Sequence, residues 1–266
     1  MLDVEFAELS DRGLCREHNE DCLGHVTPST PTQVRSQGWL FALADGLGGH
    51  EKGEVASRLA VDTVLAGFRT IPKGVMHVSL LPRLVQAANS AVYDAGHASE
   101  GQSPSMGTTL VLCALRFDSA VLSHVGDSRC YLFREGNLVQ LTHDHTMVAE
   151  QMRLGILSQA EALTAENRHI LTRCLGTELF VAADTITVNI IPGDVLLLCS
   201  DGLHSHVPEE TMSQIVNANS DLDRAVTALV AEANKNGGLD NISVQIIRIR
   251  AVERMGLYRG RPYRLL

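Results

Sequence analysis

The hydrophobic residues of this chain follow two periods, and each period predicts a different element. Runs or alternations of apolar residues typical of β-strands occupy residues 4–9, 39–44, 109–115, 120–125, 131–133, 195–199 and 242–249. In three further segments the apolar residues recur with helical spacing and share one face: residues 56–68, 81–95 and 222–233. The predicted order is strands, two helices, many strands, short helices, strands, two helices and a final strand.

The connections between successive predicted strands are short. Phe117-Asp118-Ser119, for example, is too short for a parallel crossover, so the strands on either side of it should pair as an antiparallel hairpin. Each long amphipathic helix has to bury its apolar face against a sheet. We therefore expect an α+β layered fold with mostly antiparallel sheets.

The domain organisation is predicted to be simple. No internal repeat or low-complexity linker divides the chain, which indicates a single domain over residues 1–250. Residues 142–176 are more polar than their surroundings and look like an insertion over a sheet edge. Residues 251–266 form an arginine-rich tail. Two interpretations of the tail stay open: a solvated, frayed chain end, or a segment that docks on the acidic body or on a partner protein.

Composition narrows the class of protein. The 266 residues include 22 Lys+Arg and 31 Asp+Glu, a net charge of −9, which argues against general binding to nucleic acids or anionic membranes. The six cysteines form no CxxC pair, which favours buried thiols in a reducing compartment. Residues 1–8 lack a signal-peptide pattern, and no apolar stretch approaches the ~18 residues of a membrane span. We expect a cytoplasmic protein.

Acidic residues stand repeatedly at the ends of the predicted strands. They are Glu20, Asp21, Asp45, Asp127, Asp201 and Asp240. Any one Asp-Gly pair alone is typical of a turn. If the strands share a sheet, however, these carboxylates converge at one end and repel each other unless a cation neutralises them. Ligands that are all oxygen select Mg²⁺, Mn²⁺ or Ca²⁺, and the calcium-loop spacing of an EF-hand is absent, so a catalytic Mg²⁺ or Mn²⁺ site is preferred.

A series of short motifs follows the same strand ends. In chain order they are Ser10-Asp11-Arg12-Gly13, Arg16-Glu17-His18-Asn19-Glu20-Asp21, Ala44-Asp45-Gly46-Leu47-Gly48-Gly49-His50, Gly107-Thr108-Thr109, His124-Val125-Gly126-Asp127-Ser128-Arg129, Asp144-His145-Thr146, Arg173-Cys174-Leu175-Gly176, Cys199-Ser200-Asp201-Gly202-Leu203 and Gly238-Leu239-Asp240-Asn241. Together they resemble the metal-dependent protein phosphatases, the PPM or type 2C family, in their compact bacterial form. The resemblance covers about residues 5–250. It implies an α/β/β/α sandwich with the site at one end and a flap segment over residues 142–176.

The resemblance implies two core Mg²⁺ or Mn²⁺ ions and a metal-binding role for each acidic residue. Asp45 would bridge the two core ions, and the carbonyl of Gly46 would be a further ligand. Asp201 and Asp240 would complete the first ion.

The second ion, a weaker third ion and the phosphate have implied partners as well. Glu20 and Asp21 would act on the second ion, partly through water. Asp127 would help to hold a third ion together with Asp201. Arg16 would bind the substrate phosphate, for which a planar guanidinium is well shaped.

The implied reaction is hydrolysis of phosphoserine and phosphothreonine on proteins by in-line attack of a metal-bridging hydroxide. Such an enzyme would oppose a bacterial serine/threonine kinase, and we expect a monomer. Some family members carry a histidine general acid after the second-motif Asp-Gly, but this chain has Leu47 there, which cannot donate a proton. His50 lies three residues further on, and we interpret it as structural. A metal-bound water could protonate the leaving group instead.

Other functions remain as alternatives. A phosphatase of the same fold could act on small phosphate esters, and a pseudo-phosphatase could only bind phosphoproteins, although intact Asp45, Asp201 and Asp240 argue against the latter. A nucleotide-binding kinase is disfavoured because the GxxxxGK[ST] loop is absent. Residues 143–145, His-Asp-His, do not form a preorganised transition-metal site, since adjacent residues of an extended segment point opposite ways. We interpret them as polar residues that hold the flap.

Overall fold

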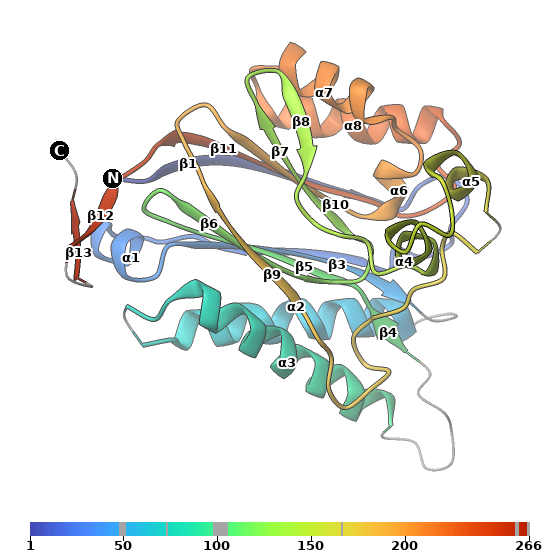
Figure 1. The fold of residues 1–266 in the computed structure, drawn as a ribbon, viewed down its shortest axis with the longest axis horizontal. Coiled ribbons are helices and arrows are strands. Elements are labelled where there is room, and N and C mark those ends of the chain that lie inside the picture. Colours follow the sequence, from blue (N-terminus) through green and yellow to red (C-terminus); the bar gives the residue numbers. More distant parts are fainter. Residues whose placement is uncertain (48–51, 73, 98–105, 166, 259–260, 265–266) are drawn as a thin grey trace.

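Two β-sheets pack face to face between two pairs of helices (Figure 1). This computed structural model describes residues 1–47, 52–72, 74–97, 106–165, 167–258 and 261–264. His50, weighed above as a catalytic residue, lies outside the described residues. The layers confirm the predicted α/β/β/α sandwich.

The first sheet has the strand order β1-β11-β10-β7-β8, and each neighbouring pair is antiparallel. Its strands are β1 (Asp3–Asp11), β7 (Arg129–Arg134), β8 (Asn137–Gln140), β10 (Val195–Cys199) and β11 (Ile242–Ala251). The second sheet has the order β2-β3-β5-β6-β9, again antiparallel throughout, and β4 pairs with β3. Its strands are β2 (Asp21–Val26), β3 (Trp39–Leu47), β4 (Gly107–Thr108), β5 (Leu110–Arg116), β6 (Ser119–Val125) and β9 (Asp184–Asn189).

Long helices cover the outer face of each sheet, as Figure 1 shows. Those on the second sheet are α2 (Lys52–Thr70) and α3 (His77–Gly96), and those on the first sheet are α7 (Glu209–Ala218) and α8 (Leu222–Lys235). The shorter helices are α1 (Pro31–Ser36), α4 (Met147–Arg153), α5 (Gln159–Thr164) and α6 (Asp201–His204). No helix in the described part of the chain is long and apolar enough to cross a membrane.

The central strands are buried on both faces, which explains their continuous apolar sequences. On β3, Leu40 and Ala42 pack under α2 and α3, whereas Phe41 and Leu43 face the other sheet. On β10, Leu196 also lies between the sheets. The acidic residues stand at or next to the ends of the buried strands.

The C-terminal segment is more regular than the sequence indicated. Residues 255–258 and 261–264 form an antiparallel pair of strands, β12 (Met255–Tyr258) and β13 (Arg261–Arg264), which the sequence analysis did not predict. Just before them, the Glu253 carboxylate is buried and forms an ion pair of 3.0 Å with Arg35 of α1. Whether the segment binds a partner stays a prediction.

Candidate metal centre

Five aspartates from separate elements come together at one end of the sandwich, and we call them the carboxylate cluster. Asp45 lies near the end of β3, and Asp21 is its register partner at the start of β2. Asp201 begins α6 directly after β10, and Asp240 lies just before β11. Asp127 lies in the turn between β6 and β7. The structure therefore brings together the aspartates that the sequence singled out.

Four aspartates of the carboxylate cluster have raised pKa values. Burial raises the pKa of Asp45 well above its ordinary value, and repulsion from Asp21, Asp201, Asp127 and Asp240 adds to the shift. Burial and repulsion from Asp240 raise the pKa of Asp201. Burial also raises the pKa of Asp21 and of Asp127 to about 7, with repulsion from Asp201 adding to both. Without added positive charge the cluster is electrostatically unfavourable.

Asp21 offers a specific test of whether a cation fits here. Its side chain is buried, and its Oδ2 accepts a hydrogen bond of 2.8 Å from the hydroxyl of Ser200. Its Oδ1 is buried without a hydrogen-bond partner. A buried carboxylate oxygen left unpaired beside other carboxylates is costly, and a hard divalent cation would satisfy it. The residues present therefore fit a magnesium or manganese centre.

The backbone around Asp45 is fixed by close contacts. The amide of Asp45 donates to the hydroxyl of Thr109 at 2.9 Å, and its carbonyl accepts from the Thr109 amide at 2.8 Å. The next residue is Gly46, where a β-carbon would lie 2.2 Å from the carbonyl oxygen of Gly53 and 2.6 Å from that of Glu20. Only glycine allows this approach, which brings the start of α2 against the cluster.

Asn241 organises the loop that carries Glu20, although sequence analysis gave it no role. Its side-chain oxygen accepts from the Glu20 amide at 2.7 Å, and its amide nitrogen donates to the carbonyls of Arg12 and His18 at 2.9 Å each. The Asn241 residue is 5% exposed, so these bonds are shielded from water. Its place beside Asp240 in a motif was the only available sequence signal.

Arg16, the predicted phosphate-binding residue, lies at the solvent side of the cluster. Its Nη2 donates to Asp240 Oδ2 at 2.6 Å, and its side chain is 51% exposed. Burial raises the pKa of Glu20 while the positive charge of Arg16 opposes the shift. Arg16 thus places a guanidinium within reach of both the cluster and solvent.

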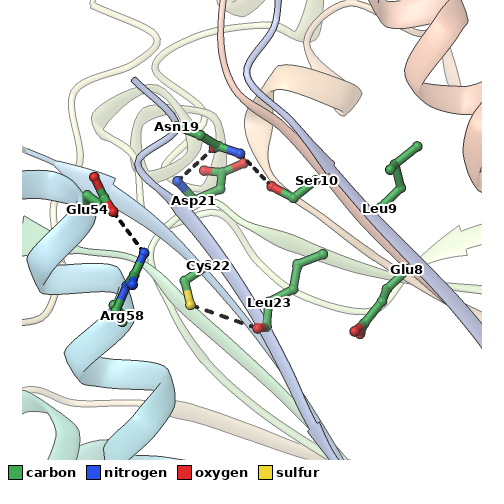
Figure 2. A pocket seen from close by; sticks show the side chains of 9 residues that line it. All are labelled: Glu8, Leu9, Ser10, Asn19, Asp21, Cys22, Leu23, Glu54 and Arg58. Carbon is green, nitrogen blue, oxygen red and sulfur yellow. Dashed lines mark hydrogen bonds and ion pairs between the residues drawn. The ribbon is translucent and has the colours of Figure 1, made fainter. Parts of the chain in front are cut away.

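An open pocket of about 580 Å³ lies beside Asp21 (Figure 2). Strands β1 and β2, the loop between them and helix α2 supply its lining: Glu8, Leu9, Ser10, Asn19, Asp21, Cys22, Leu23, Glu54 and Arg58. The Arg58 guanidinium is paired with Glu54 at 2.8 Å. The pocket gives water and ions room next to the Asp21 side of the cluster.

A second group of titratable residues, the histidine cluster, consists of His124, His145 and Asp184. Their candidate ligand atoms lie within 4.8 Å of one another. However, Arg173 Nη1 lies 2.9 Å from Asp184 Oδ1 and 3.2 Å from His145 Nε2. The guanidinium already occupies the place that a cation would need, so we do not assign a metal to the histidine cluster.

Relatives with this sequence pattern are phosphatases. A family model described as Protein phosphatase 2C matches residues 17–241. Serine/threonine phosphatase stp of Listeria welshimeri is 36% identical over 263 residues, which cover 98% of this chain and 99% of the relative. Protein phosphatase PhpP of Streptococcus pneumoniae is 33% identical over 246 residues, 92% of this chain and 97% of the relative.

Solved structures agree with the sequence relatives. The Mycobacterium tuberculosis serine/threonine phosphatase PstP/Ppp is similar with a TM-score of 0.81 at 32% identity, covering 94% of this chain and 100% of that one. The catalytic domain of PstP, in complex with two manganese ions, has a TM-score of 0.80 at 32% identity, with the same coverage. The chain therefore belongs to the protein phosphatase 2C family, the metal-dependent serine/threonine phosphatases.

Proposed function

We propose that the carboxylate cluster is the active site at which this chain hydrolyses phosphoserine and phosphothreonine in proteins, with two core Mn²⁺ or Mg²⁺ ions. The observation that carries the proposal is the convergence of five aspartates, one with a buried and unpaired oxygen. The PstP catalytic domain with two manganese ions supports the choice of metal.

The residues divide between the ions as follows. Asp45 lies among the other aspartates and would serve both core ions, with the Gly46 carbonyl as a further ligand. Asp201 and Asp240 would hold the first ion.

The remaining acidic residues would hold the second and third ions. Glu20 and Asp21 would hold the second ion, and the unpaired Oδ1 of Asp21 is suited to a water or a cation. Asp127, which faces Asp201, would hold a third and weaker ion.

Arg16 would bind the phosphate group. When bound, the ions supply positive charge toward the phosphoryl oxygens and lower the pKa of water at the site. The Arg16 guanidinium keeps one side on Asp240 and presents the rest of its planar fork to solvent, where it can donate to phosphate oxygens. Leu47, which follows Gly46, has no proton to give, so the leaving oxygen would take its proton from water.

Partners and location extend the proposal. Phosphoprotein substrates imply an opposing serine/threonine kinase as the physiological counterpart, and the chain would act as a monomer. A cytoplasmic location is supported by the six cysteines, all of which are free thiols.

The deciding experiment compares p-nitrophenyl phosphate with a phosphothreonine peptide, each with Mn²⁺ and with EDTA. We expect both to be hydrolysed with Mn²⁺, and both activities to be lost in EDTA. Competition between the peptide and small phosphate esters separates a protein phosphatase from an enzyme of small esters. Binding of the peptide without turnover at any Mn²⁺ concentration would instead show a pseudo-phosphatase.

A further inference from the structure

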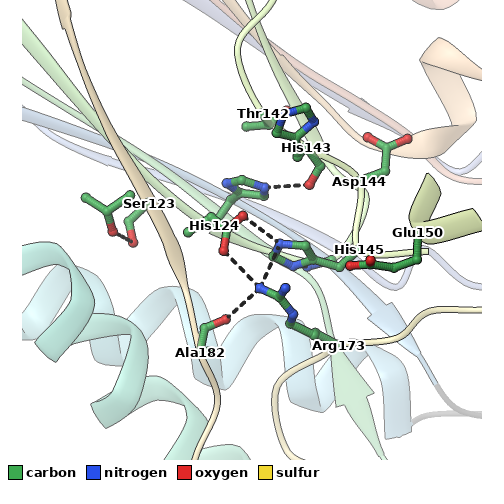
Figure 3. Close-up of polar contacts among 12 residues, drawn as sticks. Ser123, His124, Thr142, His143, Asp144, His145, Glu150, Arg173 and Ala182 are labelled. Atoms are coloured by element: carbon green, nitrogen blue, oxygen red, sulfur yellow. Dashed lines mark hydrogen bonds and ion pairs between the residues drawn. The ribbon is translucent and has the colours of Figure 1, made fainter. Parts of the chain in front are cut away.

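His145 lies at the base of the flap segment, between β8 and α4, and every polar group of this residue is engaged. The residue is 2% exposed, and its ring stacks on that of His124 with the ring centroids 4.8 Å apart (Figure 3). Burial lowers the pKa of His145, and the neighbouring His124 and Arg173 lower it further. The ring is therefore neutral near pH 7 and has one donor and one acceptor nitrogen.

The acceptor nitrogen holds the turn that contains Asp127. The amide of Gly126 donates to His145 Nδ1 at 3.1 Å, and the amide of His145 donates to the Gly126 carbonyl at 3.0 Å. Both backbone polar groups of Gly126 are thus bound by one residue. Because Nδ1 accepts, the proton of the neutral ring is on Nε2, and the 3.2 Å approach of Arg173 Nη1 to Nε2 is a contact between two donors, both of which face Asp184.

The donor nitrogen is oriented by Asp184. His145 Nε2 lies 3.3 Å from Asp184 Oδ2. Figure 3 shows Arg173 beside His145, and Arg173 Nη1 donates to Asp184 Oδ1 at 2.9 Å. Although burial opposes it, hydrogen bonds from Arg173 and His145 hold the pKa of Asp184 below its ordinary value. Asp184 stays a carboxylate and selects the ring tautomer that leaves Nδ1 free to accept from Gly126.

On its other side, the turn that contains Gly126 packs closely against Thr109. Gly126 has a φ of +102°, and a β-carbon there would lie 2.6 Å from Thr109 Cγ2. The Thr109 hydroxyl is 2.7 Å from the Ser128 hydroxyl, and Thr109 also binds the backbone of Asp45. The turn therefore lies between His145 and the residue that fixes Asp45.

Both ends of the flap segment meet at His145. The carbonyl of His145 accepts from the amide of Thr172 at 2.8 Å, and Thr146 forms a β-bridge with Leu171. One buried residue of the flap's first segment thus contacts both its last segment and the turn that carries Asp127.

We propose that His145, oriented by Asp184, is a positioning residue that holds Asp127 against the Asp45 side of the metal centre and couples this turn to the base of the flap. The proposal rests on the proposed function for its catalytic consequence, but the geometry itself is independent of catalysis. His145 acts through Gly126 and does not touch the substrate.

Two substitutions separate the nitrogens of the ring. In His145→Asn the amide oxygen takes the place of Nδ1 and can still accept from Gly126. In His145→Gln the amide nitrogen takes the place of Nε2 near Asp184, but no acceptor faces Gly126. In metal-free protein, NMR hydrogen exchange at the Gly126 amide should stay slow in His145→Asn and accelerate in His145→Gln.

The second readout is catalysis. With p-nitrophenyl phosphate, His145→Gln should lower kcat about 10–100-fold or raise the half-activating Mn²⁺ concentration by a similar factor, as is usual when a residue behind a metal ligand is lost. KM at saturating Mn²⁺ should change little, and His145→Asn should recover most of the activity. The matched control is His143→Gln, because His143 is the exposed neighbour two positions before in the same segment of the chain.

A second variant tests the same contact at a position where misfolding is not expected. The Asp184 side chain is 41% exposed, so Asp184→Ala should fold and lose activity, but by a smaller factor than His145→Gln. Unchanged Gly126 exchange in His145→Gln, or equal losses of activity in the Asn and Gln variants, would overturn the proposal. If the wild-type protein has no phosphatase activity, the proposed function fails, while the exchange experiment still decides the positioning role.

Discussion

The carboxylate cluster and the histidine cluster are both compact groups of titratable residues, yet their charges are balanced differently. The histidine cluster is neutralised from within: Arg173 binds Asp184, and the two rings bind backbone groups. Burial lowers the pKa of both His124 and His145, so neither ring adds a charge.

Among the described residues, no buried guanidinium forms an ion pair with the carboxylate cluster, and Arg129, which acts on Asp127, is itself paired with Asp144. In the described residues, the Arg16 guanidinium contacts it only from the solvent side, through Asp240, and Asp21 keeps an unpaired buried oxygen. Proximity of ligand-type side chains therefore does not by itself identify a metal site. The decisive feature is charge that the protein leaves without a counter-charge.

The largest loss of activity is expected when a carboxylate of the cluster is removed. Asp45→Ala or Asp201→Ala should lower kcat for p-nitrophenyl phosphate by at least ~10³-fold, because several kcal/mol of charge stabilisation depend on the ions these residues hold. Asp62→Ala is the matched control, since Asp62 is an exposed aspartate on α2. Steady-state kinetics at saturating Mn²⁺ measure the effect. Near-wild-type turnover in either variant would rule out the assigned site.

A smaller effect is expected from removal of Arg16, the guanidinium that pairs with Asp240. Arg16→Ala should raise KM about 10–100-fold with a smaller change in kcat, because a hydrogen bond to a charged group is worth ~1.5–3 kcal/mol. Arg12→Ala is the control on the same loop, since the Arg12 side chain bonds only to the Glu17 carbonyl among the described contacts. An unchanged kcat/KM in Arg16→Ala would show that this residue does not bind phosphate.

The smallest effect should follow from removing the internal counter-charge of the histidine cluster. Arg173 and Asp184 are both partly exposed, so their ion pair is worth at most ~1 kcal/mol. Arg173→Ala should lower Tm by no more than about 4 °C. Its kcat should stay within about threefold of wild type, since Asp184 still orients His145. Thermal melts and kinetics on the same preparation check both values, and a loss as large as that of Asp45→Ala would erase the distinction between the clusters.

Much of the fold was predictable because the central strands are buried on both faces. The apolar run at residues 195–199 coincides with β10, and the helical faces at 56–68 and 81–95 lie within α2 and α3. The strands β8 and β9 were not predicted: both lie at sheet edges, and neither contains a fully buried residue that would require an apolar run. Their position depends on the neighbouring strand, which local sequence does not encode.

The candidate site was likewise only partly predictable from the sequence. The aspartates could be identified from the sequence because each lies in or close to the end of a strand. The bond from Ser200 to Asp21 joins residues 179 positions apart, and the bond from Asn241 to Glu20 joins residues 221 apart. The contact of His145 with Gly126 likewise exists only once the flap base folds onto the turn. Such partners follow from tertiary packing and leave no local pattern.

The number of divalent ions that the protein binds tests most directly whether the carboxylate cluster is the metal centre. Calorimetric titration of Mn²⁺ into metal-free wild-type protein should show at least two ions per chain, and the double variant Asp45→Asn, Asp201→Asn should lose them. The Arg173→Ala variant should bind the same number of ions as wild type. If wild-type protein binds no Mn²⁺ at millimolar concentration, or if the double variant binds as many ions as wild type, the carboxylate cluster is not the metal centre.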